Sequence, residues 1–296
     1  MILIPGFSPR PSCRTIWLSS AAREAWERPL ADAARACEAI ELEAVRSGQR
    51  ACATLTTDPE GLIDFASRNP DLRLLPLRKT ARFLGFSHRH EDPKPCEPYF
   101  MYSVIARDTA DLLRFKAAFA AGDNVAQGSL LGFPECCGKF FEQIWPLGYF
   151  DPIWQAAEAD HDKGRAKAAM IHLYVPEGPN PGRIITLDAA HPYANPLLRY
   201  IGIRVSFHIP CSFSCAETAA TGERRISLLV PEQRAVVEAL LSMPMEWDVL
   251  HGIAVIKTPI FWIVTSSVPT TSRYRVRVKG TWTPREAAWR LPEAEG

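Results

Sequence analysis

The sequence lacks the features that would place it in several large classes of enzyme. It has no glycine-rich phosphate loop of the Walker type, no Gly-x-Gly-x-x-Gly after a strand and no Gly-x-Ser-x-Gly elbow. Nucleotide hydrolysis, nicotinamide chemistry and serine hydrolysis are therefore disfavoured. The Cys-x-x-x-Cys-x-x-Cys motif of radical S-adenosylmethionine enzymes is also missing. The formal net charge is only +1, so no excess of basic residues points to a nucleic-acid partner.

Signals for export and for membrane insertion are missing too. The N-terminal residues MILIPGFSPRPSC lack the basic start and the apolar stretch of about 7–15 residues that a secretory signal needs. The apolar stretch over residues 253–264 contains a lysine and a proline and is shorter than the roughly 20 residues that span a bilayer. We therefore expect a cytoplasmic protein without a membrane partner. Its eight cysteines should be reduced there, so that paired cysteines indicate ligation or catalysis before disulfides.

The composition is that of a globular chain with a large core. Of the 296 residues 47% are hydrophobic, so gross stability needs neither a disulfide nor a metal. Mixed helical and strand patterns predict an α+β fold, either continuous or divided into an N-terminal α/β lobe over residues 1–98 and a core over residues 99–296. Three β-rich runs, 247–257, 260–266 and 274–279, are separated by turn-forming residues and predict an antiparallel C-terminal meander.

Two cysteine pairs lie where helices are predicted to begin. In LGFPECCGKFFEQIW, Pro134 suits a first helical position, which places Cys136 and Cys137 in the first turn. In HIPCSFSCAETAA, Ser214 and Glu217 have the spacing of a capping box, which would start a helix at residue 215. Helix N-termini offer unpaired N–H groups and partial positive charge, and both favour thiolates, the form of cysteine that binds metals.

If the two helix starts face each other, Cys136, Cys137, Cys211 and Cys215 offer four sulfurs to one centre. This number holds a [4Fe–4S] cluster or a zinc ion. Because adjacent cysteines should be splayed at a tight zinc tetrahedron but can bind different irons, the sequence favours the iron–sulfur cluster, with zinc as the alternative cofactor. His208 lies on the same approach and is an alternative ligand or a proton carrier.

The same cysteines have two plainer interpretations. Small thiols are among the most buried side chains, so both pairs can simply be core. They can also be redox-active, although neither has the Cys-x-x-Cys spacing of thioredoxin-like sites. The isolated cysteines at positions 13, 37, 52 and 96 are expected to be buried or inert surface thiols.

The motifs LGFPECC and HIPCSFSCAE, followed by WDVLHGIAVIKTPIF, resemble those of a prokaryotic family of unknown function. The resemblance covers roughly residues 128–263. It implies no catalytic assignment, and it adds weight to the two cysteine pairs acting together.

Further titratable residues are candidates for proton transfer beside the sulfur centre. His208 and Glu217 lie on the segment that carries the second cysteine pair, and His251 precedes a glycine inside a predicted strand. A second ligand set, His88, His90 and Asp92, can be drawn on one side of an extended chain, although a solvated polar loop explains it more simply.

Three functions are consistent with these residues. The first is an iron–sulfur enzyme for electron transfer, sulfur transfer or Lewis-acid chemistry, acting on a small-molecule substrate or a redox partner. The second is a zinc-stabilised protein that binds a partner without catalysis. The third is a thiol enzyme with Cys136 or Cys215 as its nucleophile. The sequence leaves the substrate and the oligomeric state open.

Overall fold

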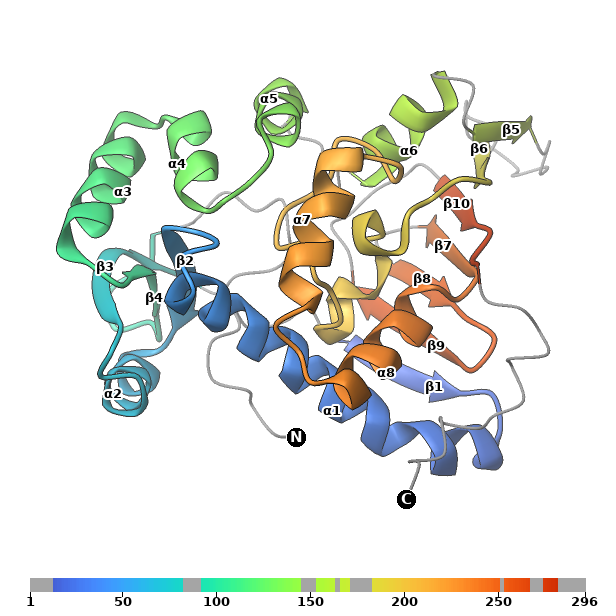
Figure 1. The fold of residues 1–296 in the computed structure, drawn as a ribbon, viewed down its shortest axis with the longest axis horizontal. Helices are drawn as coiled ribbons and strands as arrows, with labels where there is room; N and C mark the ends of the chain where they lie inside the picture. Colours follow the sequence, from blue (N-terminus) through green and yellow to red (C-terminus); the bar gives the residue numbers. More distant parts are fainter. Residues whose placement is uncertain are drawn as a thin grey trace. The chain divides into compact units, whose positions relative to one another are not determined.

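The computed structural model describes residues 13–81, 92–144, 153–162, 166–170, 183–250, 253–266 and 274–281 (Figure 1). Helices and sheets are mixed, which confirms the predicted α+β class. The chain forms two compact units, one containing Glu41–Phe150 and the other containing Ser12–Ile40 and Asp151–Gly296. Neither unit begins or ends near residue 98, where the sequence analysis placed a boundary.

The first unit is built on a three-stranded antiparallel sheet of order β2-β4-β3. Its strands are β2 (Cys52–Thr57), β3 (Arg73–Thr80) and β4 (Phe100–Ala106). Because β4 is the central strand, a division at residue 98 would separate it from both of its neighbours. Buried side chains of the sheet pack with those of α2 (Pro59–Arg68) and α3 (Thr109–Ala121) in two apolar clusters.

Both of these helices begin as their sequences dictate. The side chains of Asp58 and Asp108 each accept a hydrogen bond from the backbone N–H three residues further on, which satisfies a donor that the first helical turn leaves unpaired. Helix α3 ends at Gly122, whose φ of 68° is a left-handed conformation that glycine adopts without strain. Helices α4 (Asn124–Leu130) and α5 (Glu135–Ile144) follow.

The second unit contains a seven-stranded sheet of order β1-β9-β8-β7-β10-β6-β5. The strands are β1 (Cys13–Trp17), β5 (Ala166–Met170), β6 (Arg183–Leu187), β7 (Met245–Leu250), β8 (Ile253–Lys257), β9 (Phe261–Ser266) and β10 (Tyr274–Val278). Neighbouring strands are antiparallel except β10 and β6, which are parallel.

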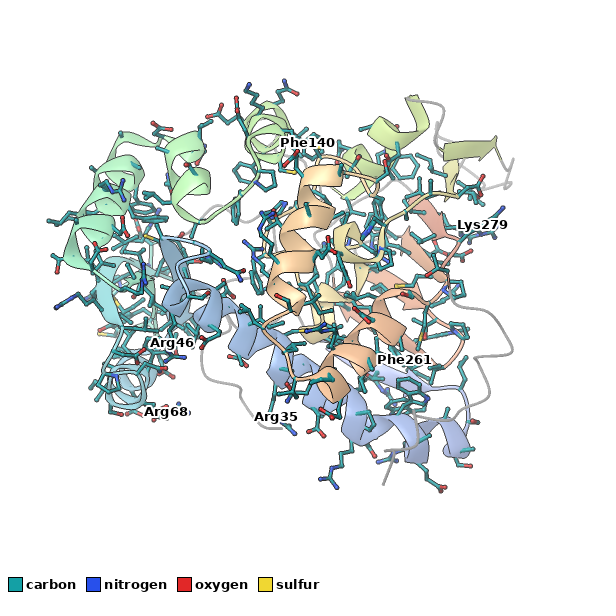
Figure 2. All side chains as sticks on the ribbon, viewed as in Figure 1. Arg35, Arg46, Arg68, Phe140, Phe261 and Lys279 are labelled. Carbon is teal, nitrogen blue, oxygen red and sulfur yellow. The ribbon has the colours of Figure 1, made fainter. Side chains whose placement is uncertain are left out.

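Alternation along these strands separates a buried face from a polar one. Trp247, Ile256, Ile263 and Val276 are in register across the sheet and are fully or almost fully buried. Phe261 on the same face is also fully buried, and Figure 2 shows it among the side chains of the core. The opposite face carries Glu246, Asp248 and the cations that pair with them. One face is therefore apolar and the other charged, as an antiparallel sheet with one solvated side requires.

The C-terminal strands form only part of the predicted meander. The run 247–257 is two strands, β7 and β8, and β9 follows them in antiparallel order. Strand β10 then pairs with β7 and β6 instead of β9, so that the order is not a simple meander. Since the two hydrogen-bonding edges of a strand look alike to a local pattern, the pattern could not choose between these neighbours.

The helices of this unit are α1 (Ser20–Arg46, its last residues in the other unit), α6 (Ile153–Asp162), α7 (Ala216–Ile226) and α8 (Pro231–Leu241). Two short 3₁₀ helices, η2 (Pro192–Ala194) and η3 (Leu197–Ile201), lie between β6 and α7 in the chain. In Figure 1, α7 and α8 lie in front of the sheet. No helix in the described part of the chain has the length and apolar character needed to cross a membrane.

Candidate metal centre

The first cysteine pair lies in the first turn of α5. Helix α4 ends at a tight turn in which Gly132 has a φ of 67° and the N–H of Phe133 donates to the carbonyl of Gly128 at 2.8 Å. Pro134 follows, and its carbonyl accepts the N–H of Cys137 at 3.0 Å. Glycine permits the turn and proline suits the helix start, so the LGFPECC motif fixes both cysteines where the sequence predicts them. Cys136 is exposed, whereas Cys137 is 2% exposed.

The second pair lies at the start of α7. Cys211 is half-buried on the preceding loop, and Cys215 is the buried N-cap residue of the helix. The sulfur of Cys215 accepts the backbone N–H of Thr218 at 3.5 Å. Both pairs therefore lie at helix N-termini, as predicted, and the N–H group and the helix dipole at Cys215 favour negative charge on its sulfur.

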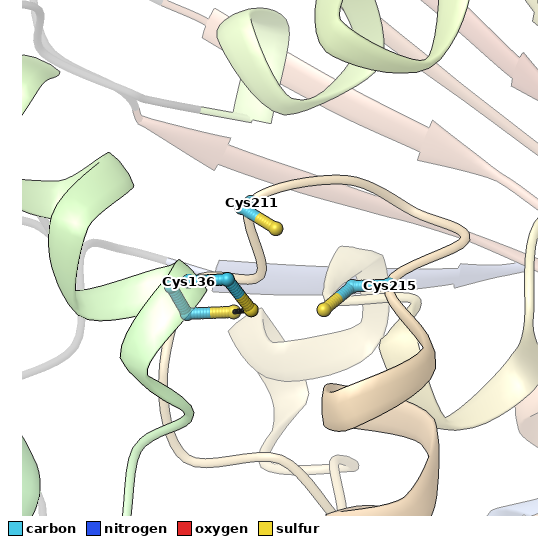
Figure 3. Close-up of side chains that lie close together, drawn as sticks. Cys136, Cys211 and Cys215 are labelled. Atoms are coloured by element: carbon cyan, nitrogen blue, oxygen red, sulfur yellow. Dashed lines mark hydrogen bonds between the residues drawn. The ribbon is translucent and has the colours of Figure 1, made fainter. Parts of the chain in front are cut away.

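The four sulfur atoms form one group. The Sγ atoms of Cys136, Cys137, Cys211 and Cys215 all lie within 4.8 Å of one another. Figure 3 shows the side chains of the three labelled cysteines pointing toward one another. The sulfurs of the adjacent pair, Cys136 and Cys137, are 3.9 Å apart. Four convergent thiols of this kind can hold a metal ion.

The distance within the adjacent pair bears on which metal fits. A Zn–S bond of about 2.3 Å places the sulfurs of a tetrahedral site about 3.8 Å apart. The separation of 3.9 Å in the Cys136–Cys137 pair matches this value. Two neighbouring thiols in this helical turn therefore lie at a separation that a single ion can accept.

Two hydrogen-bonded pairs flank Cys215. The hydroxyl of Ser214 donates to Oδ1 of Asp160 at 2.6 Å, and Nε2 of His208 lies 2.9 Å from the hydroxyl of Thr218. Asp160, His208 and Thr218 are all buried. The residues before and after Cys215 are thus held by side chains from α6 and from the loop that precedes the cysteine pair.

The structure corrects the predicted capping box. Cys215, rather than Ser214, is the N-cap residue, and α7 begins at Ala216. Ser214 does not cap the helix because its hydroxyl is bonded to Asp160. Glu217 is exposed in the first turn of α7.

The three residues proposed for proton transfer differ in their relation to the cysteine group. His208 is not in the ligand group, but it is connected to Cys215 through Thr218, whose hydroxyl it contacts and whose N–H reaches the sulfur. The backbone carbonyl of Glu217 accepts the Thr221 hydroxyl, and the Glu217 side chain is exposed. His251 lies outside the described residues.

The second predicted ligand set receives no support. His88 and His90 lie outside the described residues, and Asp92 forms an ion pair with Arg78 at 2.9 Å. A surface ion pair of this kind is consistent with the simpler interpretation, in which Asp92 belongs to a solvated polar loop.

The isolated cysteines behave as expected. None of them belongs to the four-sulfur group of the described residues. Burial raises the pKa of Cys37 to about 11 and that of Cys52 to about 12. Cys96 is exposed and Cys13 half-buried. The two buried thiols are therefore poor nucleophiles and poor metal ligands near neutral pH.

Asp160 is the residue near the cysteines that the sequence analysis missed, although a signal was present. Helix α6 places Ile153, Ala156 and Ala157 on its buried side, and Asp160 follows at the same helical spacing. An acidic residue on an apolar stripe requires a partner, and Ser214 supplies one hydrogen bond.

Comparisons with family models, with curated proteins and with solved structures find no match to this chain. The resemblance to a prokaryotic family accordingly stays a prediction, and the chemistry of the four sulfurs is the basis for assigning a function.

Proposed function

We propose that this protein binds one tetrahedrally coordinated metal ion, zinc, through the thiolates of Cys136, Cys137, Cys211 and Cys215. The observation that carries the proposal is the proximity of the four sulfurs, all within 4.8 Å of one another. Thiolates prefer soft or borderline metals, and four of them match the commonest all-cysteine zinc site. The coordination set is complete with protein ligands, which is typical of structural zinc.

A site closed by four protein ligands bears on whether the metal can take part in catalysis. Four protein sulfurs leave no coordination position for a water molecule or a substrate, whereas catalytic zinc keeps one open. We therefore assign the ion a structural role, in which it fixes the first turn of α5 and the start of α7. Binding also requires that the thiols lose their protons, so uptake of the ion should weaken as the pH falls.

An iron–sulfur cluster is the second candidate. It uses the same cysteines but places each thiolate on a separate iron atom, further from the common centre than around a single ion. The exposure of Cys136 favours this candidate, because an exposed side chain can move outward without opening the core. Such a cluster would serve electron transfer or sulfur transfer with a redox partner or a small-molecule substrate.

Metal analysis separates these candidates. Protein purified without oxygen is assayed for zinc, iron and acid-labile sulfide and scanned for visible absorption. We expect one equivalent of zinc, no sulfide and no colour, and we expect a Cys136→Ala/Cys211→Ala variant to lose the zinc. The matched control is Cys13→Ala/Cys96→Ala, which removes two thiols outside the group and should keep the zinc.

The other outcomes are equally informative. Iron and sulfide in equal amounts, with a brown colour that the Cys136→Ala/Cys211→Ala variant loses, would replace zinc by the cluster. Wild-type protein that holds no metal and takes up none when zinc or ferrous iron and sulfide are added would overturn both candidates.

A further inference from the structure

Asp160 occupies a position that is unfavourable for a carboxylate. Only 2% of the residue is exposed, and its Oδ2 atom has no hydrogen-bond partner among the described residues. Among the described residues the other oxygen accepts one hydrogen bond, from the Ser214 hydroxyl at 2.6 Å. Burying a carboxyl group with one donor costs stability, so the group needs a role that offsets this cost.

The role follows from competition for the start of α7. Serine is a strongly preferred N-cap residue, and Ser214 with Glu217 has the spacing of a capping box. Left to local preference, the helix would start one residue earlier than it does. The observed N-cap is Cys215, while the Ser214 hydroxyl points to Asp160. The hydrogen bond to Asp160 therefore keeps the Ser214 hydroxyl, which is the better capping group, from capping the helix.

A shift of the helix start by one residue would move the sulfur ligand. With Cys215 as the N-cap, its sulfur accepts the N–H of Thr218 and lies with the other three sulfurs. With Ser214 as the N-cap, Cys215 would become the first helical residue, and its ψ would have to change from the extended value of 112° to roughly −42°. That change would reorient the side chain of Cys215 relative to the other three sulfurs.

We propose that Asp160 is a positioning residue for the metal centre: by engaging the Ser214 hydroxyl it sets the first residue of α7 and thereby directs the sulfur of Cys215 to the metal. This role rests on the proposed function, because it concerns the same ligand. The His208–Thr218 contact acts in the same direction, since it fixes the residue whose N–H the sulfur accepts.

The test is the affinity for Co²⁺, whose thiolate complexes are coloured, measured by titration against a competing chelator. We expect Asp160→Ala to bind Co²⁺ about tenfold to 100-fold more weakly than wild type, the usual effect of removing a partner that orients a ligand. Asp160→Asn keeps an acceptor oxygen for the hydroxyl and should stay within about threefold of wild type on the same grounds. If Asp160→Ala fails to fold, Asp160→Leu, which fills the volume without an acceptor, replaces it.

The Ser214→Ala substitution provides the decisive comparison. Alanine cannot cap a helix, so this variant should retain Cys215 as N-cap and bind Co²⁺ almost as wild type does. The double variant Asp160→Ala/Ser214→Ala should bind more tightly than Asp160→Ala alone, because the competing cap has been removed. Ser206→Ala is the matched control, since its hydroxyl donates to the Tyr193 carbonyl in the same unit and should not affect affinity.

Two results would overturn the role of Asp160, and they are distinguishable. If wild-type protein binds Co²⁺ and Asp160→Ala binds it equally well, or if the double variant is no better than Asp160→Ala, the positioning role is wrong while the metal site stands. If wild-type protein binds neither Co²⁺ nor zinc, the proposed function fails, and the role of Asp160 fails with it.

Discussion

Cys136 differs from the other three cysteines of the group in being exposed. In metal-free protein we therefore expect iodoacetamide to alkylate Cys136 before the other three cysteines of the group. We expect bound zinc to slow this reaction by at least about tenfold, because coordination competes with attack by the sulfur. Peptide mass spectrometry over a time course, with and without zinc, measures the rate at each cysteine.

Three other cysteines serve as internal controls for this measurement. Cys37 and Cys52 should stay unmodified in both states, since burial raises their pKa to about 11 and about 12 and leaves almost no thiolate near neutral pH. Cys96 is exposed and outside the group, so its rate should not depend on zinc. Equal rates at Cys136 with and without zinc would show that it is not a ligand.

At this scale the sequence predicted the group of four cysteines but not its surroundings. Pro134 and the paired spacings identify four cysteines near helix starts, because those signals are local. The Asp160–Ser214 bond joins residues 54 positions apart, and no local pattern reveals which hydroxyl a buried acid will engage. Ser214 was consequently assigned to the cap, where local preference would place it.

The contact between α7 and η2 depends on a glycine. A Cβ atom at Gly222 would lie 2.5 Å from the Cβ of Tyr193 and 3.1 Å from Cγ2 of the buried Val205. We expect Gly222→Ala to lower the free energy of unfolding by roughly 1–3 kcal/mol, the usual cost of overpacking. Denaturant titration followed by circular dichroism measures this change.

Gly138 in α5 is the matched control for this substitution. Nothing lies within 4 Å of a Cβ atom built there, so Gly138→Ala should be neutral or should stabilise the helix by up to about 1 kcal/mol through helix propensity. If Gly222→Ala is as stable as Gly138→Ala, the close approach of α7 to Tyr193 is not a constraint on the fold.

Elements were predictable to the extent that their signals are local. Asp58 and Pro59 are local signals for a helix start and coincide with the start of α2, and Gly122 is a local signal for a helix end and coincides with the end of α3. The neighbours of β10 were not predictable, because pairing with β7 and β6 depends on which strand edge is free once the rest of the sheet has formed. Turn residues before β10 suggested a hairpin with β9, but they do not specify a partner.

The charged face of the seven-stranded sheet makes the stability of the molecule depend on pH. Burial alone would raise the pKa of Glu246, but hydrogen bonds from Arg277 at 2.5 Å and Lys257 at 3.2 Å, with the charge of Arg275, outweigh it and hold the pKa below 4.5. The folded protein thus favours the carboxylate. Its stabilising effect is present above pH 4.5 and is lost as the pH falls through the lower value of the folded state.

We expect Glu246→Gln to lower the free energy of unfolding by about 1 kcal/mol near neutral pH, a modest value because the network is partly solvated. The difference from wild type should shrink as the pH falls through the lowered pKa of Glu246, where the wild-type carboxyl also becomes neutral. Urea titrations at several pH values measure it. Glu232→Gln, at an exposed position in α8, should show no such dependence, and a Glu246→Gln difference that stays constant down to pH 2 would contradict the assignment.

Metal removal tests whether the four-cysteine centre matters to the molecule as a whole. A ligand present at 1,000 times its dissociation constant stabilises the folded state by about 4 kcal/mol if it binds only that state. Unfolded cysteines also bind zinc, so the net effect is smaller, and a shift of several degrees in the melting temperature is expected when a chelator is added. Scanning calorimetry of wild type and of Cys136→Ala/Cys211→Ala measures this shift.

Wild type should lose stability on chelation while the variant does not respond, because the variant has no site to empty. If chelator shifts both proteins equally, the stabilising metal is bound elsewhere, and if it shifts neither, the centre does not contribute to global stability.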